Sequence, residues 1–75
     1  MTGNQLAALG ILVLRGPLTV AQIAAAQDIP TSSAHSAVMM LSRRGHVHAA
    51  GVAPSGGLTF SATDAGRAAL DADGY

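Results

Sequence analysis

Residues 29–48 read IPTSSAHSAVMMLSRRGHVH and contain the clearest periodic pattern of the chain. Their apolar residues recur at intervals of three and four, which is the spacing of one face of an α-helix. These residues are Ala34, Val38 and Leu41. Gly45 follows the periodic part and can take the left-handed conformation that often ends a helix. The stretch therefore predicts a turn, an amphipathic helix over residues 32–44 and the start of a strand.

The opposite face of this predicted helix is small and polar, with Ser32, His35 and Ser36. Arg43 and Arg44 stand together in its last turn, where cations interact favourably with the helix dipole. Small polar groups on one face and cations at one end suit a helix that enters the major groove of DNA. DNA binding is therefore the first functional hypothesis.

Two helices are predicted before this stretch. The first covers residues 4–15, with Asn4 as its N-cap and apolar residues spaced three and four apart. Gly10 lies inside it and costs about 1 kcal/mol relative to alanine, so we expect another helix to pack closely there. The second helix covers residues 20–27, with Thr19 as its N-cap.

After the central helix, which Thr31 or Ser32 is expected to cap, the period of the apolar residues changes to two. Residues 46–61 are predicted to form a β-hairpin, because the sequence PSGG between the two alternating runs is a flexible turn. The inward-facing residues of its first strand are expected to be Val47, Ala49 and Val52. A last helix over residues 63–71 follows, with Thr63 as its N-cap.

The length and composition predict one small domain over residues 1–75, mainly α with a small β-hairpin. At this size a single core is only marginally stabilising. Hydrophobic residues make up 49% of the chain, but only Phe60 and Tyr75 are aromatic. The core must therefore consist of small aliphatic side chains, which bury little area each. Association would add stability, and we expect a homodimer.

The formal net charge is zero, with four arginines and four aspartates, whereas nucleic-acid-binding domains are usually basic. DNA binding therefore depends on where the charges lie. The absence of cysteine excludes disulfides and thiolate chemistry. No apolar run reaches the roughly 18 residues of a membrane span, and no basic segment precedes residues 6–14 as in a signal peptide. We therefore expect a cytoplasmic protein without membrane contact.

Five short segments follow one another along the chain in a characteristic order. They are GPLT at 16–19, QIAAA at 22–26, Ile29, LSRRGHV at 41–47 and ATDAGR at 62–67. Together they resemble the winged helix-turn-helix domain of bacterial transcription regulators, most of all the MarR-like group, over about residues 6–70. The resemblance implies a three-helix winged helix-turn-helix followed by a C-terminal helix, with the hairpin as the wing.

The resemblance also implies that the third helix enters the major groove of double-stranded DNA. Hydroxyl, imidazole and methionine side chains on that helix can contact base edges. The base-facing residues would be Thr31, Ser32, Ser33, His35, Ser36 and Met39. The residues expected to contact phosphates are Arg15, Arg43, Arg44, His48 and Arg67.

The resemblance does not extend to every feature of the family. The wing loop at residues 53–57 contains no arginine or lysine, so minor-groove contact by the wing is not implied. The long terminal helices that form the dimer and the small-ligand pocket of the family have no counterpart in these residues. An effector ligand is therefore not implied either.

Metal binding and catalysis find little support in the sequence. His46 and His48 have a metal-ligand spacing, but without cysteine or a nearby carboxylate no four-ligand zinc site is expected. No glycine-flanked nucleophile, phosphate loop or carboxylate pair is visible, so neither an enzyme nor a cofactor is expected. With His35, these two histidines are instead expected to raise DNA affinity as the pH falls from about 8 to about 6, where imidazole gains charge.

Two functions remain in competition. The first is a small transcriptional repressor that binds a promoter sequence-specifically, and its size suits a phage or bacterial mobile element. The second is a winged-helix module that holds another protein without binding DNA. Zero net charge and a neutral wing favour the second function. The adjacent Met39 and Met40 favour it as well if both are exposed, although helical spacing more often packs at least one such methionine into the core.

Overall fold

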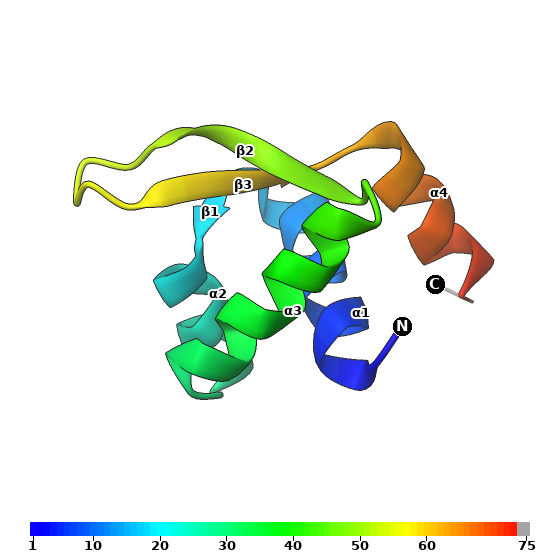
Figure 1. Cartoon of the computed structure of the whole chain (residues 1–75), viewed down its shortest axis with the longest axis horizontal. Coiled ribbons are helices and arrows are strands. Elements are labelled where there is room, and N and C mark those ends of the chain that lie inside the picture. Colours follow the sequence, from blue (N-terminus) through cyan, green and yellow to red (C-terminus); the bar gives the residue numbers. More distant parts are fainter. Residues whose placement is uncertain (74–75) are drawn as a thin grey trace.

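The computed structural model describes residues 1–73, which form four helices and a three-stranded antiparallel sheet (Figure 1). The helices are α1 (Gly3–Arg15), α2 (Val20–Gln27), α3 (Thr31–Arg43) and α4 (Asp64–Ala72). The strands are β1 (Leu18–Thr19), β2 (Val47–Val52) and β3 (Leu58–Ala62). The predicted class, mainly α with a hairpin wing, is confirmed, and each predicted helix or hairpin boundary is met to within one residue.

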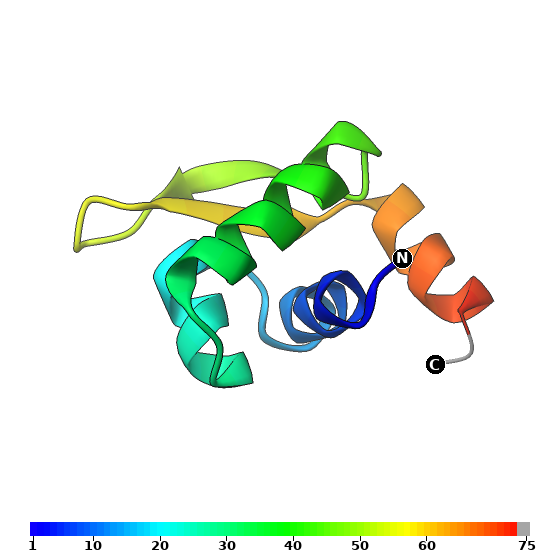
Figure 2. The same cartoon turned by 60° about the horizontal axis from the view of Figure 1, so that its bottom comes forward.

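The hairpin of β2 and β3 lies along one side of the molecule, with α1, α2 and α3 packed against it (Figure 1). The free turn of the hairpin projects beyond α2, and α4 lies at the other end. α1 and α3 are neighbours, and the N-terminal end of α1 comes forward beside α3 (Figure 2). No helix among the described residues is both long enough and apolar enough to cross a membrane.

The N-terminus of α2 is fixed by a complete capping box, because two side chains satisfy each other's backbone N–H groups. The Gln22 N–H donates to the Thr19 hydroxyl at 3.1 Å, and the Thr19 N–H donates to Oε1 of Gln22 at 2.9 Å. α2 ends at Asp28 in the left-handed region, with φ 55°. Thr19 is therefore the N-cap that the sequence predicts.

Two other predicted N-caps are wrong. Thr2, not Asn4, caps α1, and its hydroxyl accepts a hydrogen bond from the Gln5 N–H at 3.3 Å. α3 has Pro30 as its N-cap residue and no side-chain cap, because Thr31 and Ser32 already lie inside its first turn. The first amides of α3 are consequently left without a side-chain acceptor.

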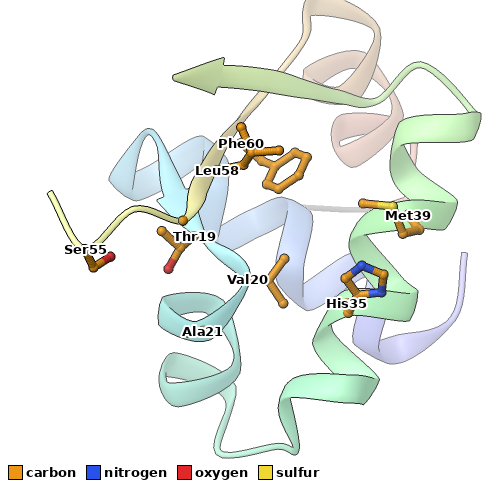
Figure 3. A pocket seen from close by; sticks show the side chains of 9 residues that line it. Thr19, Val20, Ala21, His35, Met39, Ser55, Leu58 and Phe60 are labelled. Carbon is orange, nitrogen blue, oxygen red and sulfur yellow. The ribbon is translucent and has the colours of Figure 1, made fainter. Parts of the chain in front are cut away.

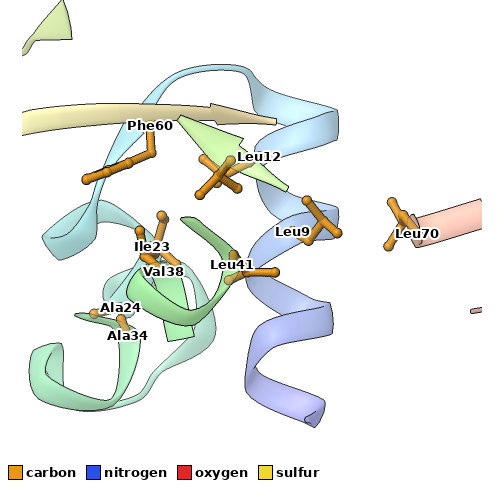
Figure 4. Close-up of a cluster of buried hydrophobic side chains, with 11 residues drawn as sticks. Leu9, Leu12, Ile23, Ala24, Ala34, Val38, Leu41, Phe60 and Leu70 are labelled. Carbon is orange, nitrogen blue, oxygen red and sulfur yellow. The ribbon is translucent and has the colours of Figure 1, made fainter. Parts of the chain in front are cut away.

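A single cluster of buried apolar side chains joins all four helices and the sheet (Figure 4). The predicted inward face of α3 is confirmed, and Leu41 is completely buried beside Leu9 and Leu12 of α1. The buried members of the cluster are Ala8, Leu9, Leu12, Ile23, Ala24, Ala34, Val38, Leu41, Val47, Phe60 and Leu70. Most are small aliphatic residues, as the composition requires.

Gly10 does not mark a close contact between helices, contrary to the sequence-based expectation. A Cβ atom at this position would have nothing within 4 Å among the described residues outside its own helix. Gly10 is half-buried on α1, on the side that no other described helix covers.

The sheet has the order β1-β3-β2, so β3 is central and β2 is an edge strand. The two-residue β1 is not predicted from sequence; it forms because Leu18 pairs with Phe60 of β3. The ladder between β2 and β3 is irregular between Ala49 and Gly51. The bulge keeps Val52 on the face of Val47 and Ala49, since these three residues pair with Leu58, Ala62 and Phe60 of β3. Only Val47 is buried, however, so the predicted burial of Ala49 and Val52 is wrong; β2 is an edge strand, and beyond Val47 it is not covered.

The start of α4 is attached to the loop that joins α3 to β2. Thr63 caps α4 as predicted, accepting from the Gly66 N–H at 3.0 Å, and its hydroxyl donates to the Gly45 carbonyl at 2.6 Å. A Cβ on Gly66 would overlap the His46 carbonyl oxygen and come within 2.9 Å of the carbonyl carbon. Only glycine allows α4 to approach the backbone of His46 this closely.

Candidate nucleic-acid interface

The exposed face of α3 carries small polar side chains. Because α3 turns once every 3.6 residues, burial of Ala34, Val38 and Leu41 on one side directs the intervening residues outward. Thr31, Ser32, His35, Ser36 and Arg43 are exposed. Four of the six residues expected to face bases therefore lie on the open surface, whereas Ser33 and Met39 are half-buried on its two flanks.

An apolar groove of about 580 Å³ lies between α3 and the hairpin, and we call it the wing groove (Figure 3). His35 and Met39 reach it from α3, Val20 from the start of α2, and Leu58 and Phe60 from β3. Met39 also packs against the core cluster. Met39 and Met40 are therefore not an exposed pair: both are half-buried, and the packing of at least one of them against the core is confirmed for Met39.

A smaller groove of about 270 Å³ lies on the other flank of α3, against the start of α1, and we call it the polar groove. From α3 it is lined by Ser33, Ser36 and Met40. From α1 and its cap it is lined by Thr2, Asn4 and Gln5. The exposed face of α3 is thus bordered by the wing on one side and by the N-terminus of α1 on the other.

The two arginines at the end of α3 have different surroundings. Nη1 of Arg43 lies 3.9 Å from Sδ of Met40, a weak contact that leaves this exposed guanidinium available. Nη1 of Arg44 donates a hydrogen bond to Oε1 of Gln5 at 3.4 Å and links the end of α3 to α1. Arg15 ends α1 and Arg67 lies on α4, so these two exposed arginines stand on other elements.

The distribution of charge favours α3 despite the net charge of zero. α3 carries His35 and Arg43 and no carboxylate. Three of the four aspartates, Asp64, Asp71 and Asp73, lie in α4 or at its C-cap. Negative charge is therefore concentrated on the element at the end of the molecule opposite the turn of the wing.

His46 and His48 differ in their burial. His48 is exposed on β2 and pairs with Ser61 of β3. His46 lies before β2 and is half-buried, and its Nδ1 atom is buried without a hydrogen-bond partner among the described residues. Within residues 1–73, no three His, Cys, Asp or Glu side chains are placed to hold a metal ion together.

Gln5 and Thr2 belong to this surface and are missed by the sequence-based reasoning. A Thr-x-x-Gln pattern, which also occurs at the start of α2, signals a helix N-terminus and could have located both residues. The contact between Gln5 and Arg44 carries no local signal, since the two residues are 39 positions apart.

The sequence matches no family model and no curated protein. Solved structures do match. A probable transcriptional regulator from Pseudomonas aeruginosa is 30% identical with a TM-score of 0.84, over 95% of this chain and 55% of that chain. The multiple antibiotic-resistance repressor (MarR) from Listeria monocytogenes is 25% identical with a TM-score of 0.81, over 95% of this chain and 48% of that chain.

BpsR from Bordetella bronchiseptica, described for the regulation of its DNA binding by 6-hydroxynicotinic acid, superposes with a TM-score of 0.86. It is 19% identical and is matched over 96% of this chain and 52% of its own, which shows a shared fold. The chain thus spans about half the length of the solved structures that it matches.

Proposed function

We propose that this chain, which has the winged helix-turn-helix fold of MarR-family transcription regulators, binds double-stranded DNA through α3. The observation that carries the proposal is the exposed, carboxylate-free face of α3, bordered by the wing. In the major groove this face would present Thr31, Ser32, His35 and Ser36 to base edges. Ser33 and Met39, at its flanks, would contact bases only at the borders of the groove.

The N-terminus of α3 supports the same mode of binding. Because no side chain caps it, its first amides have no side-chain acceptor, and the positive end of the helix dipole is unneutralised. A backbone phosphate can accept hydrogen bonds from the amides of Thr31 and Ser32. Arg43 would contact a second phosphate from the other end of the helix.

We also propose that the protein acts as a repressor in the form of a homodimer. Each neutralised phosphate contributes about −0.9 to the slope of log affinity against log salt, so four arginines per protomer provide at most about −3.6. One protomer would therefore bind weakly at physiological salt, and two protomers on a two-fold site would double this contribution. Catalysis and a cofactor form no part of this function.

Replacing Arg43 and Arg44 together with alanine is expected to weaken binding to every duplex tested. The salt slope should become shallower by about 1.8, since two phosphate contacts are lost. Ser36→Ala is the matched variant, because it removes only one hydroxyl from the exposed face of α3. It should change affinity for preferred sequences alone. Fluorescence anisotropy with labelled duplexes over a salt series measures both effects, and equal affinities for all three proteins would contradict the proposal.

DNA affinity is expected to increase several-fold as the pH falls from about 8 to about 6. His35 and His48 are exposed. A histidine side chain in general can gain positive charge in this range, and positive charge attracts phosphates. Anisotropy of the wild type against the variant His35→Gln/His48→Gln tests the assignment. A pH response that survives both substitutions would show that other groups are responsible.

A second candidate function rests on the apolar surface near the wing turn. Val52 and Leu58 face each other across the hairpin and are 68% and 55% exposed. They lie beside the wing groove, which Leu58 also lines. This surface suits a protein partner that inserts an apolar side chain. If DNA is the partner of this domain, the double variant Val52→Ser/Leu58→Ser should bind DNA like the wild type. If a protein is the partner, the same variant should no longer form the complex with that protein.

A further inference from the structure

The polar groove is lined by a mostly buried glutamine whose amide group does not use all of its hydrogen-bonding capacity. Gln5 is only 7% exposed and lines this groove. Its Oε1 atom accepts from Arg44, but within residues 1–73 its Nε2 atom donates to no protein atom. This amide group is not fully enclosed by the protein, so it can donate to an acceptor that enters the groove.

The conformation of Gln5 distinguishes it from the equivalent residue of α2. In α2, Gln22 folds back and accepts from the N-cap amide of Thr19. Gln5 stands at the same position after Thr2 but extends toward Arg44 of α3 instead. Its side chain is therefore directed between the two helices, where it reaches the polar groove.

Several groups in and next to the groove can donate hydrogen bonds. The first amides of α1, at Gly3 and Asn4, have no acceptor within the helix and lie at the positive end of its dipole. The hydroxyls of Ser33 and Ser36 line the opposite wall, and Arg44 supplies a guanidinium bound to Gln5. No carboxylate lines the groove. This donor set matches an anion with several oxygen atoms, such as a phosphate.

The position of the groove identifies the source of that phosphate. The major groove of DNA is about 12 Å wide, and an α-helix with its side chains is about 10–12 Å across. When α3 fills the major groove, the two phosphodiester backbones must therefore lie along its flanks. The N-terminal end of α1 lies beside α3, on the flank opposite the wing groove (Figure 2).

We propose that the polar groove is a second phosphate-binding site, in which the first turn of α1, Gln5 and Arg44 hold the DNA backbone that runs along the α1 flank of α3. This inference rests on the proposed function. It assigns to Gln5 a direct contact with DNA and to Arg44 a position fixed before DNA binds. A prearranged guanidinium loses less conformational freedom on binding than a free one.

The test is Gln5→Glu, which keeps the shape of the side chain but replaces its donor with a carboxylate. The new carboxylate would repel the phosphate and form an ion pair with Arg44. We expect affinity for a mixed-sequence duplex to fall about tenfold, and the salt slope to become shallower by about 0.9 because one cation is neutralised. Anisotropy over a salt series measures both, and circular dichroism of the free variant checks that it is folded.

Leu14→Glu is the charge-matched control on the same helix. Leu14 is 86% exposed and lies nine residues further along α1, about 13 Å away, beyond the Debye length of about 8 Å at physiological salt. The control should bind like the wild type. If the wild type binds duplex DNA and Gln5→Glu matches it in affinity and slope, the polar groove holds no phosphate and this inference is wrong. If the wild type itself binds no duplex, the proposed function fails first.

Discussion

Replacement of Gly66 by alanine is expected to lower the free energy of unfolding by about 2–4 kcal/mol. Alanine stabilises a helix interior by about 1 kcal/mol relative to glycine, so helix propensity alone predicts the opposite sign. The steric clash outweighs this gain in helix propensity, because the added methyl would overlap the backbone carbonyl of His46, which cannot rotate away. α4 must then move, which costs packing and partly exposes Leu70.

Gly10→Ala is the matched control for this prediction. It is the same substitution in a helix, but the new methyl would have open space around it. The only effect of this substitution is then the higher helix propensity of alanine, so the free energy of unfolding should rise by about 0.5–1 kcal/mol. Urea denaturation followed by circular dichroism measures both variants. Equal shifts of the midpoint in the same direction would show that α4 does not press against the His46 backbone.

Leu41→Ala is expected to cost about 2–5 kcal/mol, because Leu41 is completely buried in the core cluster and its removal leaves a cavity. A domain of this size has about 4–11 kcal/mol of stability in total. The variant should therefore be partly or wholly unfolded at 37 °C. Thermal unfolding followed by circular dichroism gives the measurement.

Leu14→Ala provides the comparison for Leu41→Ala, since the same atoms are removed from a side chain that is 86% exposed. Its effect should stay within about 0.5 kcal/mol. A large loss of stability in Leu14→Ala would mean that Leu14 is covered, for example by a second protomer, and the difference between the two variants would disappear.

The helices were predictable because each carries its own signal. The three- and four-residue spacing of Ala34, Val38 and Leu41 gave the inward face of α3 correctly, and Thr19 and Thr63 were recognisable caps. These features depend on residues only a few positions apart. Local chemistry therefore sufficed for the class of the fold and the order of its elements.

The features that the sequence did not predict depend on partners far away in the chain. β1 has only two residues and no pattern of its own, and it exists because β3 pairs with it. Ala49 and Val52 are exposed because β2 is an edge strand that is covered only at Val47, and the alternation within β2 does not reveal where this cover ends. On the candidate DNA surface, the exposure of His35 and Ser36 followed from helical spacing, but the role of Gln5 required the contact with Arg44.

The central claim is that the exposed face of α3 contacts a DNA duplex, and titration of the ¹⁵N-labelled protein with a duplex, followed by backbone amide chemical shifts, tests it most directly. The account predicts the largest changes at the exposed positions of α3, with smaller changes at the first turn of α1. Changes confined to α4 or to Val52 and Leu58 at the wing turn, or no changes at low salt, would contradict it.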